Sequence, residues 1–300
     1  RLSLVGSEMC IRDSLYSISI VLLFLYSLAH FNLLLNYLKS KKQKDKSQQY
    51  DLNNPSETPF VTIQLPIYNE KYVVERLLTT IAQMNYPQDK LEIQVLDDST
   101  DDSVIETAQL IKQIAATGID ITHIRRTNRT GYKAGALKEG LLTAKGEFIA
   151  IFDADFVPQK DWLYQTIPYF KNPKIGVVQT RWGHLNRDYS VLTKIQAFAL
   201  DAHFTIEQVG RNSKLHFINF NGTAGVWRKQ CIIDAGNWES DTLTEDLDLS
   251  YRAQLKKWEF KYLENVVTPA ELPAIISAAR SQQFRWNKGC LLYTSPSPRD

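Results

Sequence analysis

Short apolar runs alternate with amphipathic stretches along the chain from Phe60 onward. Each apolar run has the length of a short β-strand, and each amphipathic stretch repeats its apolar residues at helical spacing over about a dozen residues. The predicted strands are Phe60–Leu65, Leu91–Leu96, Ile119–Ile124 and Phe148–Phe152, and the predicted helices are Glu70–Gln83, Ser103–Ala115 and Ala134–Ala144. This alternation predicts an α/β fold with a mostly parallel sheet and helices on both of its faces.

A longer apolar segment precedes this domain. Leu15–Leu38 contains 24 residues and no charged side chain. As a helix it would be about 36 Å long, which is enough to cross a hydrocarbon core of about 30 Å. His30, Asn32 and Asn36 are polar, and we expect them to pack against other helices or to lie at the membrane interface. We therefore predict one transmembrane helix, with a buried core helix as the alternative.

A cluster of lysines follows the apolar segment directly, in residues 39–58, which we interpret as a basic linker. Positive charge beside a membrane helix favours the cytoplasmic side. The protein is thus predicted to sit in a plasma or inner membrane, with the domain beyond the linker in the cytoplasm. The same lysines can bind anionic lipid, and a solvated linker is the alternative. The lysines are Lys39, Lys41, Lys42, Lys44 and Lys46.

The two ends of the chain share no pattern with the segments between them. Arg1–Ser14 and Cys290–Asp300 resemble translated sequencing-adapter junctions, and we exclude both from fold reasoning; genuine terminal tails are the alternative. The predicted domain then covers residues 59–289, Cys231 is the one native cysteine, and the natural protein continues past Gly289. The three cysteines show no metal-binding spacing, and a net charge of +2 argues against a nucleic-acid-binding protein.

Acidic pairs follow two of the predicted strands. Asp97 and Asp98 come after the second strand, and Asp153 and Asp155 come after the fourth. In a parallel sheet, ligands bind outside the carboxyl ends of the strands, so both pairs are expected at the binding edge. Carboxylate oxygens suit Mg²⁺ or Mn²⁺, which in proteins is often held by one or two carboxylates together with substrate phosphates. Acidic residues that merely form turns are the alternative.

Two further motifs lie between the sheet and the C-terminal region. Asn221–Gly225 is a glycine-bearing loop, which is either an ordinary turn or a loop whose backbone approaches a substrate closely. Leu243–Asp246 opens a helical pattern that runs through Leu255. Thr244 and the acids after it also fit a simple helix cap, so this motif is either structural or catalytic.

An amphipathic stretch, Ala274–Gly289, contains the last motif. Within it, Arg285 offers a planar fork of donors that suits a diphosphate, and Trp286 offers a face on which a sugar can stack. A helix that lies on a membrane surface, with Trp and Arg at the interface, is the alternative interpretation.

Taken together, these motifs resemble the processive branch of glycosyltransferase family 2, which includes cellulose, hyaluronan and chitin synthases and the mannan synthases of the cellulose-synthase-like type. The resemblance covers residues 60–289, and the segment Phe220–Arg228 is most similar to mannan-synthase-like and related bacterial members. It implies the GT-A fold, a Rossmann-like nucleotide-binding sheet with an acceptor subdomain. The four motifs, in this order behind a membrane helix, are Asp97-Asp98, Asp153-x-Asp155, Thr244-Glu245-Asp246 and Gln282-x-x-Arg285-Trp286.

The resemblance also implies a role for each motif residue. Tyr68, Asp97 and Asp98 would hold the uridine or guanosine of a nucleotide-sugar donor. Asp155 would hold a Mg²⁺ or Mn²⁺ ion that bridges the two phosphates. The residues that the resemblance assigns to the donor are Tyr68, Asp97, Asp98, Lys133 and Asp153.

On the acceptor side, the resemblance makes Asp246 the general base, and assigns the diphosphate and the acceptor end to Gln282, Arg285 and Trp286. A sugar hydroxyl is a weak nucleophile, so a carboxylate must take its proton as it attacks the anomeric carbon. One displacement from an α-linked donor gives a β-linkage. The membrane helices that form a polymer channel in the family are absent from this chain, which leaves processivity and secretion open.

Three other functions compete with a polysaccharide synthase. A related family 2 enzyme could glycosylate a lipid acceptor, and a membrane-tethered pseudoenzyme would keep the fold without the activity. The segment around Asp153 also resembles the motif of haloacid-dehalogenase phosphatases, but Val157 stands where those enzymes have Thr, and three strands precede it. The sugar stays open among UDP-glucose, GDP-mannose and UDP-N-acetylglucosamine.

Overall fold

The computed structural model describes residues 2–42, 50–52, 54 and 57–294 of the chain. Lys44 and Lys46 of the predicted basic linker lie outside the described residues. The strands are β1 (Val61–Ile67), β2 (Leu91–Asp97), β3 (Ile121–Arg125), β4 (Phe148–Ile151), β5 (Ile175–His184), β6 (Gly225–Arg228) and β7 (Glu259–Ala270). The α-helices are α1 (Leu2–Ser40), α2 (Val74–Ala82), α3 (Ser103–Ala115), α4 (Tyr132–Thr143), α5 (Trp162–Thr166), α6 (Val191–Ala202), α7 (Gln208–Asn212), α8 (Lys229–Asp234), α9 (Glu245–Leu255) and α10 (Ile276–Thr294).

The described strands form one sheet in the order β3-β2-β1-β4-β6-β5-β7. β1 pairs in parallel with both β2 and β4, β2 with β3, and β5 with β7, whereas β6 runs antiparallel to β4 and β5. The chain leaves β1 toward β2 on one side and reaches β4 on the other, which makes the β1–β4 junction a topological switch point. The prediction of a mostly parallel sheet is confirmed.

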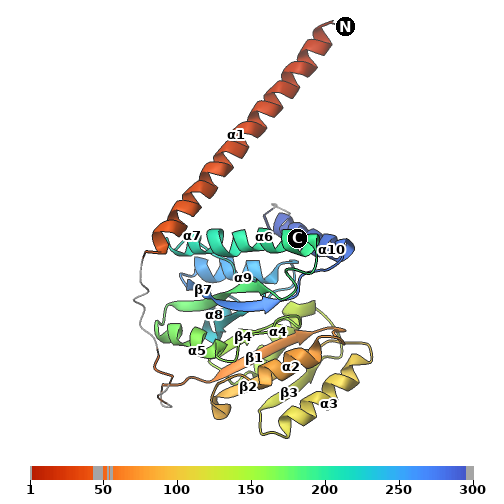
Figure 1. The fold of residues 1–300 in the computed structure, drawn as a ribbon, viewed down its shortest axis with the longest axis vertical. Helices are drawn as coiled ribbons and strands as arrows, with labels where there is room; N and C mark the ends of the chain where they lie inside the picture. Colours follow the sequence, from red (N-terminus) through yellow and green to blue (C-terminus); the bar gives the residue numbers. More distant parts are fainter. Residues whose placement is uncertain (1, 43–49, 53, 55–56, 295–300) are drawn as a thin grey trace.

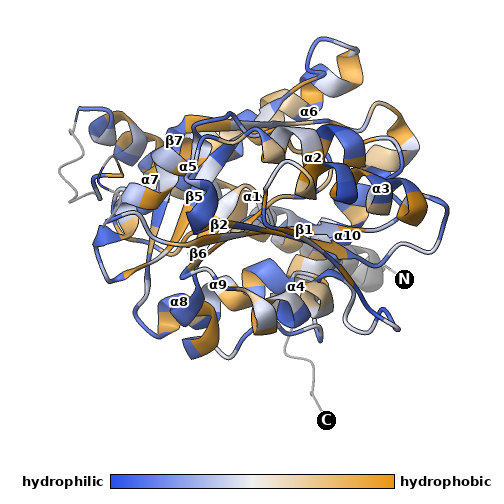
Figure 2. Cartoon of the chain, turned by 90° about the horizontal axis from the view of Figure 1, so that it is seen from below, coloured by the Kyte–Doolittle hydropathy of each residue, from blue (hydrophilic) through white to orange (hydrophobic). Residues whose placement is uncertain are grey.

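Helices cover both faces of the sheet. Figure 2 shows α2 and α3 on one side of the strands, and α4, α8 and α9 on the other. Each face has its own apolar core: Leu77 of α2 packs in the first, and Leu137 of α4 and Leu249 of α9 pack in the second. Burying such apolar area contributes about 25 cal/mol per Å². The two cores hold the carboxyl ends of the strands in fixed positions, which is what a site at that edge requires.

Helix α1 extends away from the rest of the molecule and touches it through its C-terminal part (Figure 1). Asn36 is buried there, Tyr37 Oη donates to Glu264 Oε1 at 3.4 Å, and Lys41 Nζ lies 2.9 Å from Glu264 Oε2. Within the part of the chain that the structure describes, α1 is the one helix long and apolar enough to cross a membrane, over Ile11–Ser40. The expectation that Asn36 packs against other elements is confirmed.

The predicted and observed elements differ mainly at their ends. The helix predicted to start at Glu70 begins as α2 at Val74, because Asn69 takes a left-handed φ of 57° and the chain then makes a turn before the helix. Ser103–Ala115 was predicted with the bounds that α3 has. Strands β5, β6 and β7 were not predicted.

The chain ends continue neighbouring helices. Helix α1 begins at Leu2 and runs without a break into the predicted membrane segment, and α10 continues past Gly289 to Thr294. No change of secondary structure therefore marks the boundaries at residues 14 and 290. The domain limits inferred from the sequence stay a prediction.

Candidate active site

The first part of the site lies where β1 and β2 end. Asp97, the last residue of β2, is fully buried; its Oδ1 accepts from the Ser99 amide and its Oδ2 contacts His123 Nε2, each at 2.8 Å. Burial alone would raise the pKa of Asp97, but these hydrogen bonds outweigh it and lower the pKa below its ordinary value. Both carboxylate oxygens of Asp97 are thus occupied by contacts with Ser99 and His123. Asp97 therefore fixes the loop that carries Asp98.

Asp98 forms a two-pronged ion pair with an arginine that the sequence motifs did not single out. Arg126 Nε donates to Asp98 Oδ1 at 2.9 Å, and Arg126 Nη2 donates to Oδ2. Arg126 also donates to the backbone oxygens of Thr130 and Tyr132, which ties the loop between β3 and α4 to the end of β2. A forked, buried pair of this kind fixes geometry as well as charge.

An aromatic platform lies beside this ion pair. The guanidinium of Arg129 stacks over the Tyr68 ring at 3.3 Å from the ring centre, and its Nε lies 4.0 Å from Asp98 Oδ2. Tyr68 itself is partly exposed. The structure therefore brings two predicted donor residues, Tyr68 and Asp98, together with one unpredicted arginine. Arginines at 125, 126 and 129 directly after a predicted strand were the signal in the sequence.

The second part of the site is a charge cluster around the Gly222 carbonyl. Lys133 Nζ, at the start of α4, lies 2.5 Å from Asp153 Oδ1 and donates to Gly222 O at 3.0 Å. Gly222 has a left-handed φ of 76°, and a Cβ placed on it would lie 3.2 Å from Asp246 Oδ2 and 3.6 Å from Lys133 Nζ. The glycine thus leaves the space between the lysine and Asp246 open, as expected for a loop whose backbone approaches a substrate.

The charges of this cluster act on one another. Burial alone would lower the pKa of Lys133, but Asp153, Glu245 and Asp246 together raise it above its ordinary value. Burial, and the adjacent negative charge of Glu245, raise the pKa of Asp246 to about 7, although Lys133 acts in the opposite direction. A carboxylate with this pKa is a stronger base near neutral pH than an ordinary aspartate.

Asp155 lies at the same edge, where the nearby negative charges outweigh the positive charge of Lys133. Burial, together with the negative charges of Asp153 and Glu70, raises its pKa to about 7. Among the described residues, no side chain forms a hydrogen bond or an ion pair with its carboxylate. An acidic oxygen donor without a partner, next to a second carboxylate, is a suitable ligand for a hard divalent cation. The described residues contain no group of three His, Cys, Asp or Glu that would hold a metal by itself, so phosphate oxygens would have to complete the coordination.

The start of α9 shows how Asp246 is held. Its Oδ1 accepts from the Leu247 amide at 2.9 Å, and Ser250 Oγ donates to the Asp246 carbonyl at 2.6 Å. Thr244 precedes the helix, but its side chain accepts no hydrogen bond from the helix amides. Thr244 does occupy the cap position, with Glu245 and Asp246 in the first turn, so the helix-start interpretation holds for position and not for a side-chain cap.

Helix α10 borders the site. A Cβ on Gly289 would lie 2.4 Å from Thr244 Cγ2, so the helix backbone lies directly against the start of α9. The Trp286 and Trp182 ring centres are 6.4 Å apart, and the Trp182 ring lies 5.2 Å from that of Phe156, the residue after Asp155. Trp286 is thus linked to the acidic edge through Trp182, which the sequence motifs missed.

The two other predicted residues of this motif make fewer contacts. Gln282 is half-buried and Arg285 is exposed, and neither forms a hydrogen bond or ion pair with another described side chain. They lie three residues apart on α10, and therefore on neighbouring positions of the helix surface.

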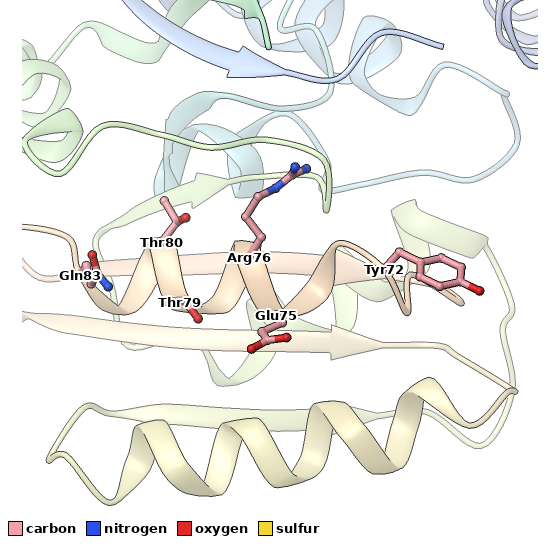
Figure 3. A pocket seen from close by; sticks show the side chains of 6 residues that line it. All are labelled: Tyr72, Glu75, Arg76, Thr79, Thr80 and Gln83. Carbon is pink, nitrogen blue, oxygen red and sulfur yellow. The ribbon is translucent and has the colours of Figure 1, made fainter. Parts of the chain in front are cut away.

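A separate surface pocket lies along α2 and contains none of the predicted site residues (Figure 3). Arg76 Nη1 in its lining lies 2.5 Å from Glu271 Oε1, which ties α2 to the chain after β7. A solvent-exposed pair of this type contributes about 0–1 kcal/mol. We therefore assign the site to the carboxyl edge of the sheet. The pocket is lined by Tyr72, Glu75, Arg76, Thr79, Thr80 and Gln83.

A Rossmann-like, mostly parallel sheet with acidic motifs at its carboxyl edge is the architecture of GT-A glycosyltransferases. The chain belongs to glycosyltransferase-like family 2, whose family model matches residues 59–289. This membership excludes the phosphatase interpretation. The glycosyltransferase family that the sequence motifs predicted is confirmed.

Curated relatives are similar over most of this chain. A probable glucomannan 4-beta-mannosyltransferase 4 from Oryza sativa subsp. japonica is 47% identical over 236 residues, which cover 77% of this chain and 43% of the relative. Glucomannan 4-beta-mannosyltransferase 1 from Cyamopsis tetragonoloba is 44% identical over 258 residues, which cover 84% and 48%. The chain thus spans less than half the length of these relatives.

Solved structures share the fold. The mannosyltransferase PcManGT from Pyrobaculum calidifontis, in complex with GDP-Man and Mn²⁺, superimposes with a TM-score of 0.69 at 24% identity, over 91% of this chain and 75% of that one. TarS from S. aureus, in complex with UDP-GlcNAc, gives a TM-score of 0.54 at 16% identity, over 72% and 59%. These likenesses show the fold.

Proposed function

We propose that the protein transfers mannosyl units from GDP-mannose to a growing β-linked polysaccharide, with inversion at the anomeric carbon. The observation that carries the proposal is the cluster at the carboxyl edge of the sheet in which Lys133 joins Asp153 to the Gly222 carbonyl and Asp246 lies against the same glycine. The curated relatives from Oryza sativa and Cyamopsis tetragonoloba are named as glucomannan mannosyltransferases, which supports mannose and a polysaccharide acceptor over the lipid alternative. Donor, acceptor and membrane are its proposed partners.

In this proposal the donor nucleoside lies against Tyr68, with Asp98 held ready by Arg126. Asp97 acts indirectly, because its buried carboxylate is occupied by Ser99 and His123 and serves to hold the loop. The donor phosphates extend from there toward Asp153 and Lys133, whose ammonium group balances negative charge on the leaving diphosphate.

A divalent cation, Mg²⁺ or Mn²⁺, fits the unpartnered carboxylate of Asp155. When bound there with the donor phosphates, the ion would neutralise charge on the leaving diphosphate. The complex of PcManGT with GDP-Man and Mn²⁺ supports this assignment by analogy of fold.

Asp246 is the proposed general base. It takes the proton of the acceptor hydroxyl as that oxygen bonds to the anomeric carbon and the bond to the diphosphate breaks. Its pKa of about 7 lets it accept a proton near neutral pH. Trp286 is proposed to stack on the acceptor sugar, and Gln282 and Arg285 to bind the diphosphate and the acceptor end. Helix α1 is proposed to cross a membrane, with the catalytic domain on the cytoplasmic side.

A donor screen tests the proposal. Membranes that contain the protein are incubated with GDP-mannose, UDP-glucose or UDP-N-acetylglucosamine, and released GDP or UDP is measured. We expect release from GDP-mannose to exceed release from either UDP-sugar by at least about tenfold, the factor that a difference of about 1.4 kcal/mol in transition-state binding gives. Faster release from a UDP-sugar would overturn the choice of donor, and no release from any of the three would overturn the activity.

A further inference from the structure

A π-helical turn, His203–Glu207, lies between α6 and α7. At its end the Gln208 amide donates to the His203 carbonyl, five residues back along the chain, where an α-helix would use the fourth. Gln208 itself is only 2% exposed. Single π-turns inside helices are frequent at functional sites, and this one fixes the position of a buried polar side chain.

Gln208 contacts the loop that carries Gly222. Its Nε2 lies 3.4 Å from Asn221 Oδ1 and 3.4 Å from His203 Nε2. Asn221 directly precedes Gly222, whose carbonyl accepts from Lys133. The buried amide of Gln208 therefore touches the residue next to the charge cluster in which the sugar transfer is proposed.

Three side-chain amides in this region have a buried polar atom without a hydrogen-bond partner. Among the described residues, nothing pairs with Gln208 Oε1, Asn219 Oδ1 or Asn221 Nδ2. We call Gln208, Asn219 and Asn221 the amide group. About nine-tenths of buried polar groups in folded proteins are paired, because an unpaired one has lost its water without a replacement. Three unpaired atoms so close together indicate that a ligand completes their hydrogen bonds.

The loop before β6 keeps its shape without these unpaired atoms. The Asn221 amide donates to Gln179 Oε1 at 3.0 Å. The Phe220 amide donates to Ser250 Oγ at 2.9 Å, and the Phe220 ring is buried in the apolar core. The backbone on both sides of the loop is thus fixed by other groups, which leaves the side-chain amides available to a ligand.

Aromatic residues connect the amide group with Trp286. Phe204 belongs to the same π-turn, and its ring centre lies 5.0 Å from that of Trp182, which lies 6.4 Å from that of Trp286. Trp182 Nε1 is also buried and, within the described part of the chain, without a partner. The unpaired polar atoms therefore extend from the loop beside Asp246 to the ring on which the acceptor sugar is proposed to stack.

We propose that Asn219 and Asn221 bind hydroxyl groups of the terminal sugar of the acceptor, and that Gln208 orients the Asn221 amide for this contact. The proposal rests on the proposed function, which supplies a polysaccharide acceptor. Asn219 offers an oxygen and Asn221 an N–H, and these fit two hydroxyls of one sugar ring, of which one donates and the other accepts. All three side chains of the amide group are uncharged, which suits a neutral carbohydrate and not a diphosphate.

The side chains of Asn219 and Asn221 are half-buried, so a small movement brings their unpaired ends to a sugar. The last torsion of an asparagine side chain is broad, and its amide can turn without a change of rotamer elsewhere. Gln208 is held more firmly, between His203 and Asn221. It is therefore a positioning residue, and the two asparagines are the residues that contact the acceptor.

Binding of β-linked mannohexaose to the detergent-solubilised full chain tests this proposal. Calorimetry gives its affinity for the unchanged protein and for Asn219→Leu, Asn221→Leu and Asn212→Leu; the affinity for GDP and the melting temperature are measured alongside. Leucine has nearly the shape of asparagine but forms no hydrogen bond. Asn212 is the matched control, because its side chain donates to Phe260 O at 2.6 Å and accepts from the Tyr262 amide at 3.0 Å.

We expect Asn219→Leu and Asn221→Leu to weaken mannohexaose binding by about tenfold or more, with the affinity for GDP unchanged. Asn219→Leu should keep the melting temperature, because Asn219 Oδ1 has no partner among the described residues. Asn212→Leu should lower the melting temperature and leave mannohexaose binding unchanged. Mannohexaoses in which one hydroxyl of the terminal sugar is replaced by hydrogen are compared as well, one position at a time. At least one of them should bind the unchanged protein about tenfold more weakly, and Asn219→Leu or Asn221→Leu should no longer distinguish it.

Unchanged mannohexaose binding in both leucine variants would overturn the proposal and show that the amides hold internal water. Equal binding of every deoxygenated mannohexaose to the unchanged protein would overturn it without any variant, which also covers a variant that does not fold. A protein that binds mannohexaose through the asparagines but transfers no mannose from GDP-mannose would overturn the proposed donor and leave the sugar subsite in place. A protein that releases GDP from GDP-mannose but binds no mannohexaose would overturn the subsite and leave the donor in place.

Discussion

At the scale of single residues, the site is a group of carboxylates with too little positive charge nearby. Asp153, Asp155, Glu245 and Asp246 act on the one ammonium of Lys133, and the pKa values of Asp155 and Asp246 both rise to about 7. Burial and the neighbouring negative charges make the ionised form of these carboxylates unfavourable, and a bound cation would stabilise that form. This excess of negative charge suits the divalent cation that we propose to bind there with the donor phosphates.

The first prediction concerns the cation at Asp155. Chelation should abolish turnover of the protein in membranes, and added Mg²⁺ or Mn²⁺ should restore it, because no described side chain forms an ion pair with this carboxylate. Ca²⁺, a larger oxygen-bound ion, is the control addition. Full activity in excess chelator would contradict the assignment.

A second prediction follows from the raised pKa of Asp155. Its pKa is about 7 in the folded protein and 3.8 in an unfolded chain, so ionisation destabilises the fold in full above pH 7 and not at all below pH 4. Asp155→Asn cannot ionise. In chelator it should therefore be more stable than the unchanged protein at pH 8, by at most about 4 kcal/mol, and equally stable at pH 4.

Thermal unfolding of the detergent-solubilised protein at both pH values measures this difference. Asp188→Asn, on an exposed carboxylate far from the acidic edge in sequence, is the control and should change nothing. The contradicting result is an Asp155→Asn variant whose stability, measured against the unchanged protein, is lower at pH 8 than at pH 4. It would show that other groups already compensate the negative charge of Asp155.

The sequence predicted the acidic residues of this site together with Tyr68, Lys133 and Trp286, but it did not predict Arg126, Arg129 and Trp182, which contact them. Carboxylates after strands are informative because the parallel sheet sends every such strand end to one edge. Arg126, Arg129 and Trp182 act through pairings between segments far apart in the chain, Arg126 with Asp98 and Trp182 with Trp286. Spacing along the sequence does not encode those pairings.

At the scale of elements, the first four strands and their helices were predictable and the later strands were not. Ile63 of β1 and Val95 of β2 are buried apolar residues within short apolar runs. Such runs, bounded by residues that favour turns, predict buried strands from the sequence. β5 and β7 mix polar and aromatic residues, and their register shifts between Thr180 and Arg181. A register shift breaks the twofold period on which strand prediction depends.

The loop before β6 yields a third prediction. Gly222→Ala should lower turnover strongly, because the added Cβ would stand 3.2 Å from Asp246 Oδ2 and 3.6 Å from Lys133 Nζ, in the space proposed for the reacting groups. Gly118→Ala is the matched control. Its φ of 91° imposes the same backbone strain, but nothing lies within 4 Å of its Cβ.

Both variants should therefore lose similar stability, about 1 kcal/mol or more from the left-handed backbone, while only Gly222→Ala loses most of its turnover. Turnover and melting temperature are measured on the same preparations. Equal turnover in the two variants would mean that the loop is an ordinary turn.

At the scale of the whole molecule, the proposed sugar-transferring site lies in a domain that contacts a long apolar helix. The family match covers residues 59–289, and the apolar helix α1 contacts that domain through Tyr37 and Lys41. The fourth prediction is the topology: nucleotide sugars are cytoplasmic, so the domain should face the cytoplasm.

Sealed membrane vesicles of both orientations test the topology. Protease should digest residues 60–289 in vesicles with the cytoplasmic side outward, and should leave them intact in vesicles of the opposite orientation until detergent is added. Digestion in the second kind without detergent would reverse the assigned side.

The catalytic assignment of Asp246 is the centre of the account, and turnover of Asp246→Asn tests it most directly. The amide keeps the size and most of the hydrogen bonding of the carboxylate but cannot take a proton. General-base catalysis contributes about 10²–10⁴-fold, so turnover of GDP-mannose should fall by at least that order while the affinity for GDP stays nearly unchanged. A first-turn acid that served only the helix would contribute about 0.3–1 kcal/mol of stability, and its loss would leave turnover nearly intact. A mutant that binds GDP normally and retains more than about a tenth of the turnover would therefore contradict the account.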